Sequence, residues 1–481
     1  MNFGLVARVL GNLLLIEGAA MVFPLGISLY YQERSAVIGF LLSMGILGLT
    51  GLFLSNIPSS SPRLKAREAI LIVTIGWVVV SFFAALPFVL SGSAFLVDAF
   101  FEAVSGLTTT GASVLRDVEG LPKGVLFWRS LLHWLGGMGI LVLTLAILPI
   151  LGVVGFQVFK AESPGPSPDK FTPRIAATSK ILYTIYGVLT AAILLGVRAA
   201  GVPWFESFVL AFGTVSTGGF GLHSDSLARW SANSPLIVLL AAAMFLAGVN
   251  FSLYYDLAKG RWRQALGNAE LRWYVAIMAL SVLTVALNLY GPVYGSIGEA
   301  LKQAWFQVGS VMTTTGYSTV DFDLWPSFSK GILFTLMFVG ASAGSTSGSV
   351  KVVRLLVAAK VVKRELSRVL HPRAAKPVVI GGRVMPPEVV QGVVGFLLLY
   401  AAVFALGFLV ISLEGLDLLS SMGAVAATLG NVGVGLGAVG PRGSFASFSS
   451  PGKLFLSFLM LLGRLELFTM LAALSPRFWR E

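Results

Sequence analysis

Four short stretches of the sequence are rich in glycine, threonine and serine and contain no charged residue. They read GLTTTGAS (Gly106–Ser113), TVSTGGFG (Thr214–Gly221), VMTTTGYS (Val311–Ser318) and TLGNVGVG (Thr428–Gly435). Glycine accepts positive φ angles, so a strand that contains it can turn successive carbonyl groups to one side. Rings of uncharged oxygen atoms replace the hydration shell of a monovalent cation, whereas divalent sites and anion pores more often use charged side chains. The stretches therefore indicate coordination of a monovalent cation.

The spacing of the stretches indicates a repeat. With Gly111, Gly218, Gly316 and Gly433 taken as equivalent, the separations are 107, 98 and 117 residues. A period of roughly a hundred residues is too long for a solenoid and fits a unit of span, pore loop and span. One such cluster would more often mark close packing of membrane helices, but four copies at matched positions argue against that interpretation.

A short amphipathic segment precedes each stretch and must position it. These segments are VDAFFEAVSGL, WFESFVLAFG, GEALKQAWFQVGSV and LDLLSSMGAVAA. As helices they are too short to cross a bilayer, and irregular backbone at membrane depth is tolerated only inside protein or beside water. Four such loops imply a pore on a pseudo-fourfold axis. The C-terminal ends of the helices carry partial negative charge, and we expect them to face the central cavity and favour a cation there.

The composition indicates a membrane protein. Hydrophobic residues make up 56% of the 481 residues, charged residues make up 12%, and the mean hydropathy is +0.85. A bilayer core of about 30 Å needs roughly 20 apolar residues in a helix, and the sequence contains ten such runs. A cytoplasmic N-terminus puts most lysine and arginine residues on the cytoplasmic side, as the positive-inside rule asks. Both termini then face the cytoplasm.

The runs divide the chain into five parts. They are an extra N-terminal helix pair (residues 1–56), pore repeat 1 (57–160), pore repeat 2 (161–260), pore repeat 3 with an interrupted gate helix (261–370) and pore repeat 4 (371–481). The predicted fold is an all-α polytopic membrane protein. It has four tandem span, pore loop and span repeats around a pseudo-fourfold pore, plus two extra N-terminal transmembrane helices.

Several longer motifs carry a family resemblance. FEAVSGLTTTG (Phe101–Gly111), HWLGGMGI (His133–Ile140), the STGGF, TTTGY and GNVGVG segments and GRLELFT (Gly463–Thr469) together resemble the Trk-type membrane subunit of the Trk/Ktr/HKT superfamily. The resemblance spans the whole chain, including the helix pair that Trk-type members have and Ktr-type members lack. It implies potassium uptake across the cytoplasmic (inner) membrane through a four-loop selectivity filter. Potassium, as the transported ion, would be the only metal, held at the filter.

By this resemblance, three residues of each stretch supply the carbonyl groups of the filter. They are Thr109, Thr110 and Gly111; Ser216, Thr217 and Gly218; Thr314, Thr315 and Gly316; and Asn431, Val432 and Gly433. In related plant proteins a serine at the first filter's glycine is associated with sodium transport, so Gly111 favours potassium. The NVGVG segment also resembles the potassium-channel TVGYG signature, which makes Gly433, not Gly430, the equivalent glycine.

The second span of the third repeat is interrupted by GASAGSTSGS, and this loop is the candidate gate. A phosphate-binding loop would end in GK[ST], which is missing, so a break in a pore-lining helix is the better interpretation. The resemblance implies that the loop hangs beneath the filter as the gate, with Gly340, Gly344, Ser345, Thr346, Ser347 and Gly348 as its residues. It also puts Arg464 near the gate, where its charge would oppose a cation. An ion pair with Glu466 that merely holds helices together is the alternative role for this arginine.

Partners are suggested by the loops and by the resemblance. The cytoplasmic loops contain no nucleotide-binding domain, and the long basic linker Val361–Pro387 offers a docking surface, although positive-inside topology also explains it. The resemblance implies a homodimer in the membrane and a cytosolic ring of regulatory subunits, with nucleotide bound only on that partner. The basic residues form no continuous patch for nucleic acid.

Other functions need features that the sequence lacks. An intramembrane enzyme would need a nucleophile with its base or a cluster of metal ligands, but Ser347 lacks a GxSG context, cysteine is absent and the three histidines are not at metal spacing. We therefore expect no enzymatic activity. Channel-like flux, coupling to protons or sodium, and a less selective potassium and sodium pore stay open. The sequence suggests no partner for Glu17.

Overall fold

Apolar runs of about 20 residues form the long helices of the protein, since a helix satisfies its backbone polar groups without water. The computed structural model describes residues 1–59, 65–139, 175–372 and 376–480. Apart from one two-stranded hairpin, the regular secondary structure of these residues is helical. The predicted all-α polytopic fold is confirmed.

The helices follow the order that the repeats predict. The N-terminal part holds α1 (Phe3–Ala20), α2 (Val22–Tyr30) and α3 (Arg34–Ser55), and the first repeat holds α4 (Ala66–Ala84), α5 (Leu86–Leu90), α6 (Leu96–Leu107) and α7 (Lys123–Gly137). The second repeat holds α10 (Ile175–Ala199), α11 (Trp204–Val215), the 3₁₀ turn η1 (Ala228–Trp230), α12 (Ser234–Ala247) and α13 (Phe251–Ala258). The third holds α14 (Trp262–Leu266), α15 (Ala269–Leu289), α16 (Ile297–Met312), η2 (Phe322–Leu324), α17 (Ser327–Val339) and α18 (Val352–Leu370). The fourth holds β1 (Val379–Ile380), β2 (Arg383–Val384), α19 (Pro387–Ile411), η3 (Ser412–Glu414), α20 (Leu418–Leu429), η4 (Gly437–Val439), η5 (Phe445–Ser447), α21 (Ser450–Arg464), α22 (Leu467–Leu474) and α23 (Pro476–Arg480).

Broken helices reduce the number of uninterrupted spans. Within the described ranges, six helices are long and apolar enough to cross a membrane, or up to eight if each of two bent pairs is one span. The pairs are α12 with α13, bent by 92°, and α21 with α22, bent by 119°. Of the ten runs expected, the one that begins in α7 continues outside the described residues, and the run over residues 332–360 is divided between α17 and α18. The expected boundary after residue 160 also lies outside them.

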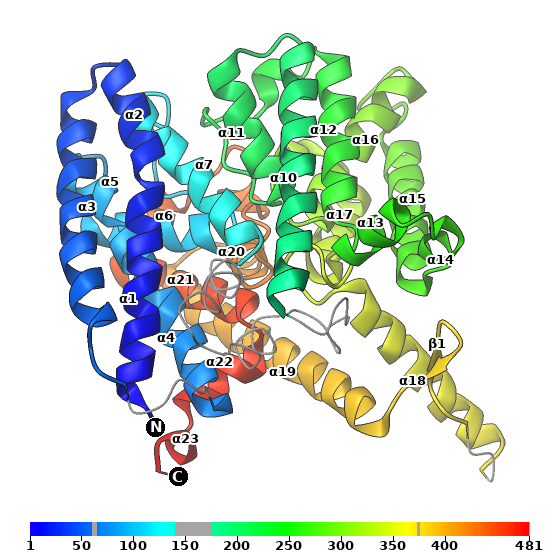
Figure 1. Ribbon diagram of the computed structural model, residues 1–481. Coiled ribbons are helices and arrows are strands. Elements are labelled where there is room, and N and C mark those ends of the chain that lie inside the picture. Colours follow the sequence, from blue (N-terminus) through cyan, green and yellow to red (C-terminus); the bar gives the residue numbers. More distant parts are fainter. Residues whose placement is uncertain (60–64, 140–174, 373–375, 481) are drawn as a thin grey trace.

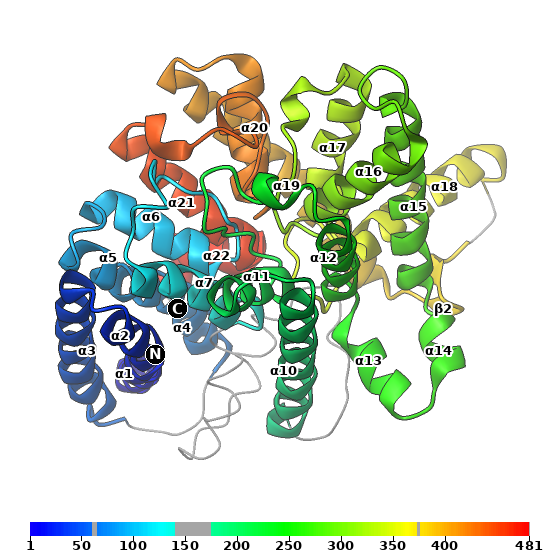
Figure 2. The ribbon, with the colours of Figure 1, turned by 90° about the horizontal axis from the view of Figure 1, so that it is seen from above.

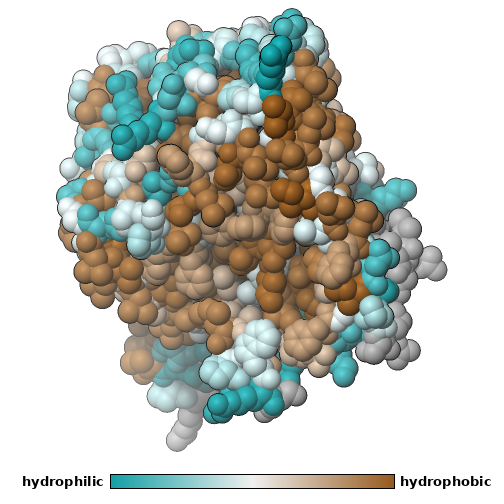
Figure 3. Space-filling view, turned by 90° about the vertical axis from the view of Figure 1, so that its left-hand side faces the viewer, coloured by the Kyte–Doolittle hydropathy of each residue, from teal (hydrophilic) through white to brown (hydrophobic). Residues whose placement is uncertain are grey.

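The N-terminal helices pack closely on one another and face lipid with their other side. Gly11 of α1 and Gly51 of α3 meet, because a Cβ atom on Gly11 would lie 2.7 Å from the Gly51 carbonyl oxygen. Small residues allow such close backbone approach in membranes. On the outer side of α3, Leu49 and Phe53 are 74% and 72% exposed. Figure 3 shows this side as a broad hydrophobic surface with hydrophilic rims above and below, as a bilayer requires.

The four short helices and the helices that follow them form a closed ring. Neighbouring contacts run from α6 to α7, α11, α12, α16, α17, α20 and α21, and α21 contacts α6 again. In the view from above, the four repeats surround a common centre (Figure 2). The expected pseudo-fourfold arrangement is thus present in the backbone, with α6, α11, α16 and α20 as the pore helices.

One end of the molecule carries both termini and the extension of α18. In Figure 1, N and C lie at the lower end, and α18 leaves the helical body at its lower right. The hairpin that follows pairs Val379 with Val384 and Ile380 with Arg383. The basic linker Val361–Pro387 therefore consists of the end of α18 and this hairpin, with residues 373–375 outside the described part of the chain.

Candidate ion pathway

Each pore helix leads into a short extended segment, called a strand below, and the four segments share one backbone pattern. A residue other than glycine at positive φ stands two places before a glycine at positive φ. The first kind are Thr109 (53°), Thr217 (54°), Thr314 (59°) and Asn431 (52°), and the glycines are Gly111 (81°), Gly219 (78°), Gly316 (81°) and Gly433 (82°). Positive φ is unusual for any residue other than glycine, and for a β-branched threonine it is a true outlier. Three threonines and one asparagine with matching positive φ indicate one functional geometry repeated four times.

The second repeat needs a correction of one residue. Gly219, and not the Gly218 that the spacing predicts, has the conformation of the other three glycines. The matching triplet is therefore Thr217, Gly218 and Gly219, and Ser216 falls outside it. Two adjacent glycines left the choice open in the sequence, and the backbone decides it. The separations between equivalent glycines become 108, 97 and 117 residues.

Ser216 instead closes its pore helix. Its φ of −82° is helical, and its hydroxyl group donates to the Phe212 carbonyl oxygen at 2.6 Å. Thr108 and Thr313 occupy the same place in their repeats and donate to carbonyl oxygens four residues back at 2.7 Å. These hydroxyl groups fix the ends of the helices, where backbone carbonyl groups carry partial negative charge.

The four strands contact one another in a closed circle. A Cβ atom on each of the four glycines would collide with a carbonyl oxygen of the next strand. The pairs are Gly111 with Gly218, Gly219 with Thr315, Gly316 with Val432, and Gly433 with Thr110. All four oxygens belong to the residue that precedes the glycine, so the contacts follow a fourfold rule. The absence of a side chain at each glycine lets the carbonyl groups approach this closely.

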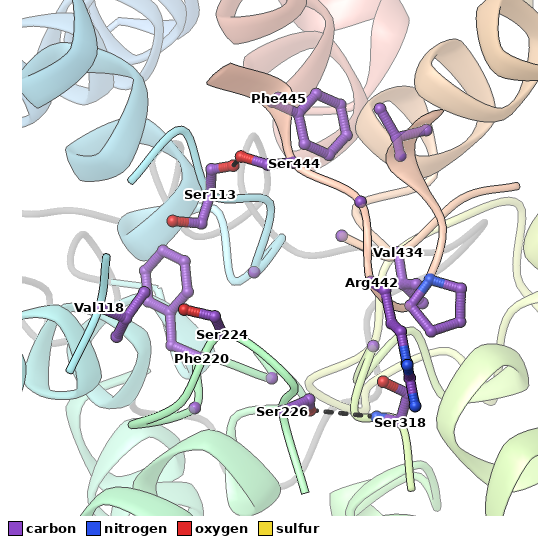
Figure 4. Close-up of a pocket in the computed structure, with 18 of the residues that line it drawn as sticks. Ser113, Val118, Phe220, Ser224, Ser226, Ser318, Val434, Arg442, Ser444 and Phe445 are labelled. Carbon is purple, nitrogen blue, oxygen red and sulfur yellow. Dashed lines mark hydrogen bonds between the residues drawn. The ribbon is translucent and has the colours of Figure 1, made fainter. Parts of the chain in front are cut away.

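A cavity of about 170 Å³ opens above this circle, lined by the same four glycines. Figure 4 shows that loops of all four repeats surround it, with Ser113 and Ser444 on one side and Ser226 and Ser318 on the other. The backbone amide of Ser318 donates to the Ser226 hydroxyl group at 3.2 Å, which ties the third repeat to the second. The circle therefore has an open polar approach on this side.

A buried ion pair holds the strand beyond Gly111. Glu102 of α6 and Arg129 of α7 are 3.1 Å apart and almost inaccessible to solvent. Glu102 also accepts from the Ser113 hydroxyl group and the Val114 amide at 2.6 and 2.8 Å. The guanidinium group of Arg129 lies 4.1 Å from the ring centre of Phe220. Because both charges are satisfied, this pair anchors the loops around the cavity instead of presenting a free charge to it.

Comparisons with known proteins agree with this architecture. The family model described as "TrkH: Cation transport protein" matches residues 46–480. The chain belongs to the TrkH family of cation transport proteins. It is 40% identical to the Trk system potassium uptake protein TrkH of Salmonella typhimurium and 39% identical to that of Escherichia coli, each over the full length of both chains. The crystal structure of the potassium transporter TrkH from Vibrio parahaemolyticus superposes with a TM-score of 0.90 at 36% identity, covering 100% of both chains. The resemblance read from the motifs is confirmed.

In this TrkH-family chain, the interruption after α17 lies against the side of the circle opposite the cavity. The Gly348 amide donates to the Thr314 hydroxyl group at 2.7 Å, and a Cβ atom on Gly348 would lie 2.5 Å from the Gly430 carbonyl oxygen. The Thr346 hydroxyl group donates to the Val215 carbonyl oxygen at 3.1 Å. The loop thus touches the first residues of three of the four strands or their helix ends.

The candidate gate residues lie at different places in this loop. Gly340 (φ 70°) ends α17, and Gly344 (φ 72°) turns the chain toward α13, whose Phe251 amide donates to its carbonyl oxygen at 3.0 Å. The Ser345 hydroxyl group donates to the Ser342 carbonyl oxygen at 2.6 Å and is 2.8 Å from that of Ser347. Gly344 is exposed, whereas Gly340 and the candidates from Ser345 to Gly348 are buried.

Arg464 joins this loop to two other repeats. It is the last residue of α21, and its guanidinium group donates to the carbonyl oxygens of Thr346 at 2.8 Å, Gly136 at 2.7 Å and Gly137 at 3.1 Å. Five donors in a rigid fork allow one arginine to bind several carbonyl groups. Arg464 is therefore the link between the gate loop, the end of α7 and the break in the last span.

Glu466 pairs with a different arginine from the one that we expected. Its carboxylate is 2.5 Å from Arg354 of α18, and the Arg354 guanidinium group also lies 3.8 Å from the ring centre of Phe396. The expected local pair between Arg464 and Glu466 is replaced by this contact between α18 and the start of α22. Arg354 and Glu466 are 112 positions apart, and no sequence pattern predicted that they would pair.

Two further charged residues, Lys351 and Glu270, hold the loop, although no sequence motif indicates a role for them. The ammonium group of Lys351 donates to the carbonyl oxygen and, at 3.1 Å, to the hydroxyl group of Ser347. Glu270 of α15 accepts from the amide of Ala343 at 2.7 Å, inside the loop, and from that of Val353 at 3.3 Å, in the first turn of α18. A lysine two residues after the GASAGSTSGS run, within an apolar part of the chain, was the available signal.

Proposed function

We propose that the protein takes up potassium across the cytoplasmic membrane through the four strands, which act as its selectivity filter. The observation that carries this proposal is the closed circle of carbonyl contacts between equivalent glycines and their neighbours. The names of the relatives, Trk system potassium uptake proteins, support the choice of ion. The reaction is transport alone, with no chemical step on a substrate.

The proposed coordinating atoms are backbone carbonyl oxygens of the corrected triplets. They belong to Thr109, Thr110 and Gly111; Thr217, Gly218 and Gly219; Thr314, Thr315 and Gly316; and Asn431, Val432 and Gly433. These oxygens would replace the hydration shell of a monovalent cation without a charged side chain. The C-terminal ends of α6, α11, α16 and α20 add partial negative charge beside the pathway, which lowers the free energy of a cation and raises that of an anion.

We assign the gate to the loop from Gly340 to Lys351 together with Arg464. The loop fills the space next to the helix ends Val215 and Gly430, and Arg464 brings a positive charge to the same place. Both features raise the barrier for a cation. Opening then requires the loop to leave the Thr314 hydroxyl group and the Arg464 guanidinium group to leave the Thr346 carbonyl oxygen.

We further propose that a cytosolic nucleotide-binding regulatory subunit controls this gate and that the membrane protein is a homodimer with both termini in the cytoplasm. The support is the link from the gate to the exposed end of α18, through Arg354 and Glu466. That end carries the exposed Lys360 and Lys363 and the partly exposed Arg364, and the hairpin follows it. A partner that moved α18 would therefore also move the gate loop, which ends where α18 begins.

Flux measurements test the transport proposal. Purified protein in liposomes loaded with potassium chloride and diluted into sodium chloride should accumulate trace rubidium above the level of protein-free vesicles. Internal sodium in place of potassium should reduce the accumulation, since the gradient that drives rubidium inward is then missing. Equal accumulation with and without protein, in vesicles shown to contain folded protein and with the regulatory subunit added, would refute the proposal.

A further inference from the structure

A histidine of the first repeat bonds directly to the filter strand of the second. His133 lies on α7 and is completely buried. Its Nδ1 is 2.8 Å from the Gly106 carbonyl oxygen, and its Nε2 is 3.2 Å from the Phe220 amide nitrogen. The imidazole ring also lies 4.2 Å from the ring of Phe220, centre to centre. One side chain thus joins a pore helix to the neighbouring strand.

The two hydrogen bonds determine which tautomer is present. A carbonyl oxygen only accepts, so Nδ1 carries the proton toward Gly106, and a backbone amide only donates, so Nε2 is the acceptor for Phe220. His133 is therefore neutral with its proton on Nδ1. No other arrangement satisfies both partners.

The Phe220 amide belongs to the peptide unit whose carbonyl group is that of Gly219. In a trans peptide the N–H and C=O groups point in opposite directions. A histidine that holds the N–H on one side of the strand therefore holds the Gly219 carbonyl oxygen on the opposite side. Loss of this hydrogen bond would free the peptide unit to rotate, and glycine at position 219 opposes that rotation little.

His133 also explains why the second strand differs in sequence from the others. A Cβ atom on Gly218 would collide with His133 Cγ and lie 2.6 Å from Nδ1. The equivalent positions in the other strands hold Thr110, Thr315 and Val432, which carry side chains. The imidazole ring occupies the space that a side chain fills in the other strands.

The second repeat offers a matched position without this chemistry. Cβ atoms on Gly137 and Gly248 would each lie 2.5 Å from a tyrosine hydroxyl group of the next repeat, so the two glycines are equivalent. Four residues earlier stand His133 and Met244, and Met244 is equally buried. Methionine has no donor and only a weak acceptor, so it packs without fixing a peptide group as histidine does.

We propose that His133 is a positioning residue for ion selection, which holds the Gly219 carbonyl group in its coordinating orientation. The proposal rests on the function proposed above for the four strands. In this proposal His133, which lies outside the four strands, sets the orientation of a carbonyl group in one of them. The hydrogen bond from the Phe220 amide to Nε2 fixes the Gly219 carbonyl group, and the hydrogen bond from Nδ1 to Gly106 orients the imidazole ring.

Substitutions at 133 separate the two contacts. His133→Met removes both hydrogen bonds and gives the residue found at Met244. His133→Gln places an amide near Nε2 and keeps an acceptor for the Phe220 amide, whereas His133→Asn places its amide near Nδ1 and keeps only the Gly106 contact. We expect the potassium to sodium permeability ratio, from reversal potentials in reconstituted bilayers, to fall at least about five-fold in His133→Met and His133→Asn. His133→Gln should keep most of the parent's ratio.

Two more variants act as controls. Met244→Leu should leave the permeability ratio unchanged, because Met244 holds no peptide group. Gly218→Ala should lower the ratio as His133→Met does, because its methyl group displaces the imidazole ring, and it tests the inference if His133→Met does not fold. An unchanged ratio in a folded His133→Met or Gly218→Ala variant, or equal losses in His133→Gln and His133→Asn, would overturn the inference. A parent protein that does not discriminate potassium from sodium would instead refute the proposed function, before any variant is measured.

Discussion

The guanidinium group of Arg464 donates a hydrogen bond of 2.8 Å to the Thr346 carbonyl oxygen, which joins the end of the last pore-lining helix to the loop beneath the filter. Hydrogen bonds to charged groups are worth about 1.5–3 kcal/mol. We therefore expect Arg464→Ala to raise potassium flux in liposomes without a regulatory subunit about ten-fold or more. Stopped-flow flux normalised to folded protein measures this.

A shortened gate loop also tests the gating mechanism, because the loop is the hydrogen-bond partner of Arg464. Deletion of residues within Gly344–Gly348 should also raise flux, since it removes the Thr346 contact together with the loop's contact with Thr314. Arg464→Lys, which keeps the charge but loses the fork of donors, should give an intermediate flux. If the Arg464→Ala and deletion variants fold and insert but conduct no faster than the parent, the gate lies elsewhere.

Gly219 tests the corrected position of the second strand. Gly219→Ala should greatly weaken the preference for potassium over sodium, because its φ is 78° and its Cβ would collide with the Thr315 carbonyl oxygen. Gly111→Ser and Gly316→Ser should have the same effect for the same reason. Gly309→Ala is the matched control, since Gly309 lies in α16 with nothing within 4 Å of an added Cβ. A preserved permeability ratio in Gly219→Ala would exclude this position from the filter.

The pair formed by Arg354 and Glu466 should contribute to stability, because their side chains are only 7% and 18% exposed. Removal of one partner from a buried pair costs roughly 3–5 kcal/mol. Arg354→Ala and Glu466→Gln should each lower the midpoint temperature of unfolding in detergent. Arg364→Ala breaks an exposed pair with Glu365 on the same helix and should cost at most about 1 kcal/mol. Equal midpoints for Arg354→Ala and Arg364→Ala would contradict this assignment.

Single cysteines report the orientation in the membrane, because the chain has no cysteine of its own. Ser224 is exposed beside the cavity above the filter, and Lys376 is exposed on the linker at the other end. An impermeant thiol reagent added to intact cells should label Ser224→Cys and should label Lys376→Cys only after lysis. Labelling of Lys376→Cys from outside would reverse the topology. Lys376 is used instead of Ala374 on the same linker, because Ala374 lies outside the described residues.

The sequence was sufficient for the repeats because pore helix, glycine strand and following helix recur with little variation. Its main error was local. The second stretch contains Gly218 and Gly219 in succession, and the ring of His133, which lies far away in the sequence, requires the first of them to lack a side chain. Alignment on the residue two places before the glycine, Thr109 with Thr217, would have given the correct position.

Long-range charge pairing was beyond the reach of sequence patterns. Arg464 and Glu466 stand two residues apart, which favoured a local pair, but the 119° bend between α21 and α22 turns their side chains to different partners. Bends of this kind depend on packing among several helices. Glu17 is a different case, since it is fully buried in α1 and neither of its carboxylate oxygens has a hydrogen-bond partner among the described residues.

The left-handed backbone of Thr109, Thr217, Thr314 and Asn431 implies that ion discrimination is more fragile than the fold. Residues held in such sparsely populated conformations cost on the order of 1–3 kcal/mol each and persist only where their surroundings enforce them. The four strands share that enforcement, because each touches the next. Conditions that loosen the packing behind them, such as mild detergent or gentle warming, therefore relax the strands first. A preparation can then keep its full helical content and yet no longer tell potassium from sodium.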